Sequence, residues 1–179
     1  MSLYVIQAPS RAEDRLIRVA NRRLPEYTFV CPRREIKIRR RGKTLKEVRP
    51  LFPGYVFLEA EEIDERLFRE VRRLPGFIRF LEENTRIIPL LGQDLDLIRR
   101  LLSFGEIVRE SKVTFDKNKR IVVVSGPLEG MEGRIVRVDK RKGRAKVRLD
   151  LYAESFLVDL GFELINEAAG AGQRSSKST

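Results

Sequence analysis

Arginine and lysine have the most distinctive spacing of any residues in this chain, and their chemistry is the binding of anions. Nine of them, with two acids, fall within residues 33–49, and eight, with one acid, fall within residues 134–148. Each segment therefore carries +7 of a net charge of +11, which leaves −3 for the rest of the 179 residues. A surface that only keeps a protein soluble mixes the two signs, whereas charge gathered in patches indicates a polyanionic partner such as nucleic acid.

Two groups of cations in the first 50 residues are candidates for binding RNA. Four arginines at spacings of 4, 3 and 4 lie in a narrow stripe on a predicted helix, which is either a ridge facing phosphates or an ordinary solvated face. The stripe consists of Arg11, Arg15, Arg18 and Arg22. The second group consists of Arg33, Arg34, Lys37, Arg39, Arg40, Arg41 and Lys43. Arginine predominates in residues 33–49, and its planar guanidinium suits phosphate and guanine. We hypothesise that both groups belong to one RNA-facing surface.

A third group of cations forms a C-terminal basic patch. It consists of Arg134, Arg137, Lys140, Arg141, Lys142 and Arg144.

Little in the sequence indicates catalysis or a bound metal. Histidine is absent and Cys31 is the one cysteine, which removes the commonest general base and any Cys/His zinc cluster. No phosphate-binding loop or nucleophile motif is present. We therefore expect a protein that is not an enzyme and holds no cofactor or metal, with an enzyme acting on RNA left as an alternative. No apolar run is long enough to span a membrane, and no signal peptide is apparent, so a cytoplasmic location is expected.

The N-terminal part of the chain has an α+β pattern. Residues 3–8 predict a buried strand, and Ser10 and Glu13 have the spacing of a capping box for a helix ending near Leu24. Residues 27–40 predict a strand, followed by a hairpin tip at residues 39–43. Before residue 107 the pattern predicts further strands over residues 51–58, 77–81 and 86–90, and two amphipathic helices, one over residues 63–74 and one that starts at Asp94 or Asp96.

The C-terminal part of the chain predicts a small β domain. Residues 107–118 show no sustained period and are expected to be an interdomain linker. Short strands follow, and residues 144–150 alternate without a break between charged and apolar side chains. This spacing suits a five-stranded SH3-like barrel over residues 119–166 and favours a stable β form. Residues 167–179 are small and polar, and are expected to be a disordered tail.

Four segments of the chain resemble a known family. Residues 126–135 resemble a KOW motif, with a Gly-Pro pair, two further glycines and a following β strand. Residues 4–8, 52–56 and 76–78 resemble, in order and spacing, three landmarks of the NusG N-terminal (NGN) domain. The resemblance to the NusG family of transcription elongation factors implies an NGN domain over residues 1–106, with an antiparallel sheet flanked by helices. A KOW β-barrel follows.

The resemblance also implies a mechanism. NusG-type N-terminal domains dock on the clamp helices of the RNA polymerase β′ subunit, which favours the processive enzyme over pausing. Residues that match the apolar docking surface of the family are Tyr4, Phe52, Pro53 and Tyr55. Aromatic anchors give large contact area at a low entropic cost. The same aromatic residues flank a Pro-Gly turn and also suit a core, so we expect a shared role.

Two departures point to a specialised member of the family. Leu3 stands where housekeeping members usually carry tryptophan, and residues 152–155 replace a Gly-Arg loop that meets termination factor Rho and the ribosome. With its basic segment, the chain most resembles LoaP-type antiterminators, and RfaH-type proteins next. We expect a monomer that suppresses pausing and termination and is recruited by a nascent RNA hairpin, with non-template DNA as the alternative target. Two alternatives remain: the protein is a housekeeping factor that couples polymerase to Rho or the ribosome, or it is a ribosome-associated KOW protein.

Overall fold

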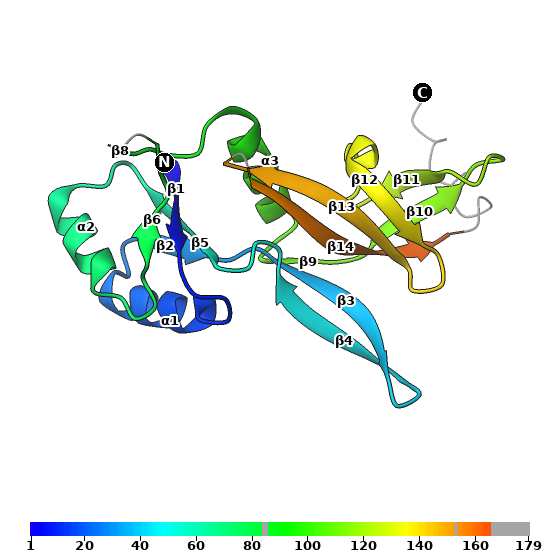
Figure 1. The fold of residues 1–179 in the computed structure, drawn as a ribbon, viewed down its shortest axis with the longest axis horizontal. Helices are drawn as coiled ribbons and strands as arrows, with labels where there is room; N and C mark the ends of the chain where they lie inside the picture. Colours follow the sequence, from blue (N-terminus) through cyan, green and yellow to red (C-terminus); the bar gives the residue numbers. More distant parts are fainter. Residues whose placement is uncertain (84–85, 153, 166–179) are drawn as a thin grey trace, which may run out of the picture. The chain divides into compact units, whose positions relative to one another are not determined.

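The computed structural model describes residues 1–83, 86–152 and 154–165. The chain divides into two compact units. The first contains Met1–Arg33 and Arg49–Ile107, and the second contains Arg34–Val48 and the residues from Val108 onward. The chain therefore leaves the first unit after Arg33, contributes a β-hairpin to the second unit, and returns at Arg49. Figure 1 shows the order of the elements along the chain.

The first unit is built on a four-stranded antiparallel sheet in the order β2-β5-β1-β6. Its strands are β1 (Ser2–Gln7), β2 (Thr28–Val30), β5 (Tyr55–Ala60) and β6 (Arg79–Phe80). Strands β1 and β5 pair along their whole length, with Tyr4 opposite Leu58 and Ile6 opposite Val56. Four consecutive residues of each strand are buried, so both faces of the sheet are covered, which is why these strands are nearly continuous apolar runs.

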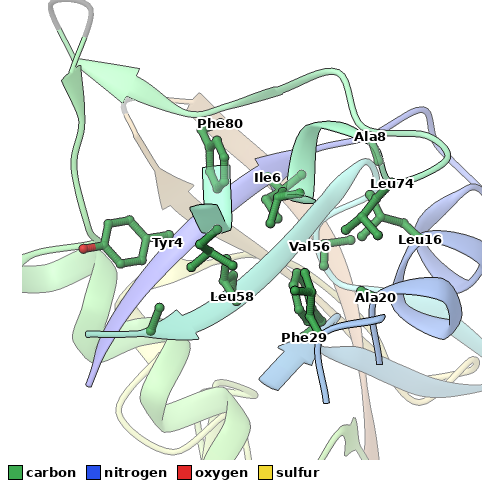
Figure 2. Close-up of a cluster of buried hydrophobic side chains, with 14 residues drawn as sticks. Tyr4, Ile6, Ala8, Leu16, Ala20, Phe29, Val56, Leu58, Leu74 and Phe80 are labelled. Carbon is green, nitrogen blue, oxygen red and sulfur yellow. The ribbon is translucent and has the colours of Figure 1, made fainter. Parts of the chain in front are cut away.

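Three amphipathic helices accompany this sheet. They are α1 (Glu13–Arg23), α2 (Glu65–Arg72) and α3 (Gly92–Ser103). Their buried residues recur at spacings of three or four, as with Leu16 and Ala20 on α1 or Leu67 and Val71 on α2. Figure 2 shows Leu16 and Ala20 in one apolar cluster with side chains of the central strands. Two short paired strands, β7 (Glu82–Glu83) and β8 (Arg86–Ile87), precede α3.

The start of α1 differs from the expected capping box. The residue that precedes the helix is Ala12, with no side-chain cap, and its N–H donates to the carbonyl of Pro9 at 2.9 Å. Arg11 adopts a positive φ of 75° in the same turn. Because this turn occupies residues 9–12, Ser10 is excluded from the capping position and the predicted helix start was wrong.

The second unit contains a five-stranded sheet in the order β11-β10-β14-β13-β12. Its strands are β10 (Ser111–Phe115), β11 (Ile121–Ser125), β12 (Ile135–Asp139), β13 (Arg144–Leu151) and β14 (Glu154–Leu164), with the 3-10 turn η1 (Glu132–Arg134) before β12. The alternation expected for residues 144–150 is confirmed, because Ala145, Val147 and Leu149 are buried in β13. The predicted α+β fold class, with its C-terminal β domain, is confirmed.

The basic segment after residue 33 forms a hairpin. Strands β3 (Arg33–Arg40) and β4 (Lys43–Pro50) join through Arg41 and Gly42, with φ values of 50° and 76°. Two consecutive positive φ angles are typical of a type I′ turn, so the predicted hairpin tip is confirmed. Figure 1 shows β3 and β4 as a two-stranded ribbon. The strand expected over residues 27–40 is interrupted at Pro32, which has no N–H to donate to a sheet.

The segment expected to be a linker contains two strands, β9 (Ile107–Val108) and β10. Strand β9 adds to the hairpin in the order β4-β3-β9. The inward residues of β10 include Ser111, which is fully buried, and a buried serine conceals the apolar alternation from sequence reading. The expected tail, residues 167–179, lies outside the described residues. No helix in the described part of the chain is both long and apolar enough to cross a lipid bilayer.

Candidate nucleic-acid interface

The tip of the β3–β4 hairpin presents unneutralised positive charge. Arg39, Arg40, Arg41 and Lys43 are exposed, and no carboxylate among the described residues lies within ion-pair distance of them. Nearer the base, Lys46 pairs with Glu35, with 2.9 Å between Nζ and Oε1. The hydrogen bond from Lys46 lowers the pKa of Glu35. The tip is therefore the part of the hairpin best suited to a phosphate-bearing partner.

The base of the hairpin is fastened to the five-stranded sheet of the same unit. The ammonium group of Lys37 pairs with the carboxylate of Glu110, at 2.9 Å, and this hydrogen bond raises the pKa of Lys37. The guanidinium of Arg144, on β13, donates to the backbone carbonyl of Lys37. Arg144 from the second basic segment and Glu110 from the residues before β10 thus both hold Lys37 of the first basic segment.

Two glycines allow these close approaches. A Cβ atom at Gly161 would lie 2.9 Å from Cγ of Glu110 and 3.6 Å from the carbonyl oxygen of Glu35. At Gly143, where φ is 60°, a Cβ atom would lie 2.8 Å from the carbonyl oxygen of Phe162. Larger residues at either position would push apart the segments that hold the basic groups.

The turn between β12 and β13 orders the exposed part of the C-terminal basic patch. The carboxylate of Asp139 accepts a hydrogen bond from the N–H of Lys142 at 2.9 Å, which lowers the pKa of Asp139. The ammonium of Lys140 lies over the Phe115 ring, 3.7 Å from its centroid. Arg141 and Lys142 remain exposed at the top of the turn.

Other members of the basic groups are less available. Arg134 lies 3.8 Å from a carboxylate oxygen of Asp150. Arg33 is mostly buried and forms an ion pair with Asp14, and Arg34 is half-buried and has a partner of its own. Arg137, in contrast, is exposed on β12.

The arginine stripe predicted for α1 is shorter than expected. Arg15, Arg18 and Arg22 lie exposed on the helix, whereas Arg11 precedes it in the Pro9–Ala12 turn. These residues belong to the first unit, whereas hairpin residues 34–48 belong to the second.

The residues expected to contact polymerase lie in the first unit and are mostly buried. Phe52 has no exposed surface and packs edge-on against Phe57, and Tyr4 and Tyr55 are each 6% exposed. The Tyr4 hydroxyl donates to the carbonyl of Glu61 at 3.4 Å and points out of the apolar cluster (Figure 2). Burial raises the pKa of Tyr4. Pro53 is exposed at the turn.

Sequence reasoning missed the residues that assemble the hairpin with the sheet. Glu110 pairs with a lysine 73 positions away, and no local pattern indicates a contact over that distance. It also missed a scatter of exposed apolar residues on the second unit, among them Val136 and Leu157. Among the residues that the structure describes, no cluster of three or more acidic or cysteine side chains is suited to hold a metal ion.

Comparisons with known proteins agree on one family. Residues 1–99 match the sequence model of the family described as "Transcription termination factor nusG". The chain is 30% identical to the transcription termination/antitermination protein NusG of Escherichia coli O6:H1, covering 92% of this chain and 95% of that protein. It is 29% identical to the NusG protein of Pasteurella multocida, covering 92% and 93%. This chain has the same fold as the solved structure titled "Domain interaction in Thermotoga maritima NusG", with a TM-score of 0.61 and 21% sequence identity. The match covers 89% of this chain and 93% of that one.

Proposed function

The chain belongs to the NusG family of transcription termination/antitermination factors, and on this premise we propose that it binds RNA polymerase and suppresses pausing and termination after recruitment by a structured nascent RNA. The observation that carries the RNA part is the concentration of exposed cations at the hairpin tip and at the β12–β13 turn. Outside residues 33–49 and 134–148 the chain is slightly acidic. A polyanion binds such patches by displacing counterions.

The polymerase contact is assigned to the first unit. Its basis is the family resemblance of the segment around Pro53, which the structure presents on a turn backed by buried aromatic side chains. We propose that this turn and the adjoining Tyr55, together with Tyr4 farther along the β1–β5 pair, contact the β′ clamp helices. A pull-down of polymerase that is lost on replacement of the β′ clamp helices, with the rest of β′ intact, supports this contact. Retention of the protein by ribosomes alone contradicts it and favours a ribosome-associated role.

The RNA contact is assigned to the hairpin tip. A duplex RNA hides the base edges of its deep groove, so we expect arginine at the tip to read phosphates and the exposed bases of a hairpin loop or bulge. A gel shift compares one hairpin RNA with duplex DNA, for the wild type and for an Arg40→Gln/Arg41→Gln variant. We expect preference for RNA, loss of affinity in the variant, and a steep dependence on salt.

A matched control removes the same charge elsewhere. Arg66→Gln/Arg69→Gln changes two exposed arginines of α2, outside both basic segments, and is expected to leave RNA affinity almost unchanged. Equal, weak binding of wild-type protein to RNA and DNA contradicts a dedicated RNA contact. The functional test is transcription in vitro through a terminator, with and without an upstream RNA hairpin, and the protein should increase read-through only when the hairpin is present.

The exposed apolar residues of the second unit favour a second candidate function. Val136 on β12 and Leu157 on β14 are 54% and 60% exposed, and β12 and β14 flank β13 in one sheet, so a protein partner that covers this sheet would bury both side chains. Under this alternative, the protein couples polymerase to Rho or to the ribosome as a housekeeping factor. Binding of Rho or ribosomes to the full chain, lost on Leu157→Ser, together with no effect of an RNA hairpin on transcription, selects this alternative.

A further inference from the structure

The two basic segments face each other across a cleft inside the second unit. Its volume is about 720 Å³. One wall comes from the hairpin and the other from the β12–β13 turn and the start of β13. The lining residues are Lys37, Ile38, Arg39 and Thr44 on the first wall, and Arg141, Lys142 and Arg144 on the second. No acidic residue is among the described residues that line it.

Hydrogen bonds and an ion pair within the second unit hold both walls of this cleft in place. Arg144 donates to the carbonyl of Lys37, and Lys37 pairs with Glu110, so these two cations are already engaged. Asp139 holds the opposite turn through its bond to the N–H of Lys142. Arg39 and Arg141, one on each wall, have no ion-pair partner in the described part of the chain.

This arrangement is costly without a ligand. Lys37 has Glu110 beside it and Lys142 lies 4.0 Å from a carboxylate oxygen of Asp139, but Arg39 and Arg141 have no acidic partner in the described part of the chain. Cations that are held together without neutralisation repel each other, and the energy is recovered when an anion enters between them. The cleft is too small for a duplex, and the absence of a lining aromatic side chain removes the stacking platform that reads or orders bases. The cleft therefore suits the backbone of a single nucleic-acid strand, which it would bind through the charge of the phosphates and not through the base sequence.

We propose that this cleft binds the phosphodiester backbone of a single-stranded RNA segment that flanks the hairpin contacted by the tip. The proposal rests on the RNA recruitment described above and adds a second site to it. Arg39 and Arg141 contact phosphates from opposite sides, and Lys142 contributes from the turn. Thr44 also lines the cleft, and its hydroxyl can exchange a hydrogen bond with a ribose 2′-hydroxyl, which selects RNA over DNA.

The test measures how much a single-stranded flank adds to affinity. Fluorescence anisotropy with the full chain compares a blunt hairpin RNA, the same hairpin with a single-stranded extension, and that hairpin with a DNA extension. For the wild type, we expect the RNA extension to tighten binding severalfold and the DNA extension to add less. The same ratio is then measured for Arg39→Gln, Arg141→Gln and the double variant, where it should fall toward one.

Matched controls remove a charge from the same strands but outside the cleft. Lys46, on β4, and Arg148, on β13, do not line the cleft, so Lys46→Gln and Arg148→Gln should leave the ratio of flanked to blunt affinity unchanged. The slope of log affinity against log salt for the flanked RNA should fall by about 1 for each cleft cation removed. In the wild type, the amide resonances of Thr44 and Lys142 should shift when the flanked RNA is added.

Three results would overturn the proposal. They are a flank that adds nothing to wild-type affinity, an RNA and a DNA flank that add equally, and controls that lose as much of the ratio as the cleft variants. Failure of the proposed function has a different signature, because the blunt hairpin itself would then fail to bind preferentially. The wild-type resonance shifts test the site even if a variant is unstable, since absent shifts count against it.

Discussion

The buried carboxylate of Glu13 accepts a hydrogen bond from the backbone N–H of Gly54, with 2.6 Å between Oε1 and N. The carbonyl of Gly54 accepts in turn from the N–H of Ala8, at 2.8 Å. Gly54 has a φ of 86°, and a Cβ atom there would lie 3.0 Å from the carbonyl oxygen of Ala8. The first turn of α1, the end of β1 and the Pro-Gly turn are thus fastened at one point. That point positions the turn assigned to polymerase binding.

Replacing Glu13 by alanine should destabilise the first unit. Glu13 is 2% exposed, so its loss leaves the N–H of Gly54 buried without its acceptor. We expect Glu13→Ala to lower the free energy of unfolding by about 1–3 kcal/mol, the usual cost of a buried unsatisfied donor. Urea denaturation followed by circular dichroism measures it. Glu13→Gln keeps an acceptor oxygen and should lose less stability than Glu13→Ala. Glu26→Gln, at an exposed position, should change stability little. Equal losses of stability in all three variants would show that the hydrogen bond to Gly54 is unimportant.

Two glycines of the same loop in the second unit should respond oppositely to alanine. At Gly126, φ is 102° and a Cβ atom would lie 2.8 Å from Cα of Ser111, whose Oγ accepts from the N–H of Leu128. We expect Gly126→Ala to cost about 1–3 kcal/mol through backbone strain.

Gly133 is the matched control for this substitution. It has no atom within 4 Å of an added Cβ, so Gly133→Ala should be neutral or slightly stabilising. Hydrogen exchange of the β10 and β11 amides measures both variants. Similar exchange rates in the two variants would mean that the close approach to Ser111 does not constrain the loop.

The sequence predicts elements well where burial follows a regular period. Strand β13 is recognisable because Ala145, Val147 and Leu149 alternate with charged residues, and the hairpin tip because Gly42 follows three arginines. It fails where a polar residue takes a buried position. Ser111 hides β10, and Glu13 has capping-box spacing from Ser10 but bonds to Gly54 instead.

The candidate site is only partly predictable for a related reason. Clusters of cations can be counted along the chain, so both basic segments are evident from composition. Their pairing across one cleft depends on contacts such as Lys37 with Glu110 and Arg144 with the Lys37 carbonyl, 73 and 107 positions apart. Such contacts leave no local pattern, because they follow from which unit the hairpin joins.

Acid should loosen the β12–β13 turn. The N–H of Lys142 holds the pKa of Asp139 below its ordinary value, so the carboxylate stabilises the folded turn above the ordinary aspartate range. That contribution is lost as the pH falls through the lowered pKa of the folded state. Hydrogen exchange at Lys142, corrected for intrinsic rates, should therefore show falling protection below about pH 4. Asp139→Ala should show low protection at every pH, whereas a pH response that persists in this variant would place its origin elsewhere.

The thiol of Cys31 should report opening of the first unit. Burial raises the pKa of Cys31 to about 12, and the side chain has no exposed surface. An unfolded cysteine ionises near pH 8.5, so between that value and about 12 the unfolded state loses a proton that the folded state keeps, and stability should decline as pH rises. Comparison of wild type with Cys31→Ala by urea unfolding isolates this decline from other titrations. At pH 8, a thiol-reactive disulfide reagent should label the denatured chain at once and the native chain only as it opens, faster in Glu13→Ala than in wild type. Full labelling of the native wild type within the mixing time would show that Cys31 is accessible and that its burial does not protect it.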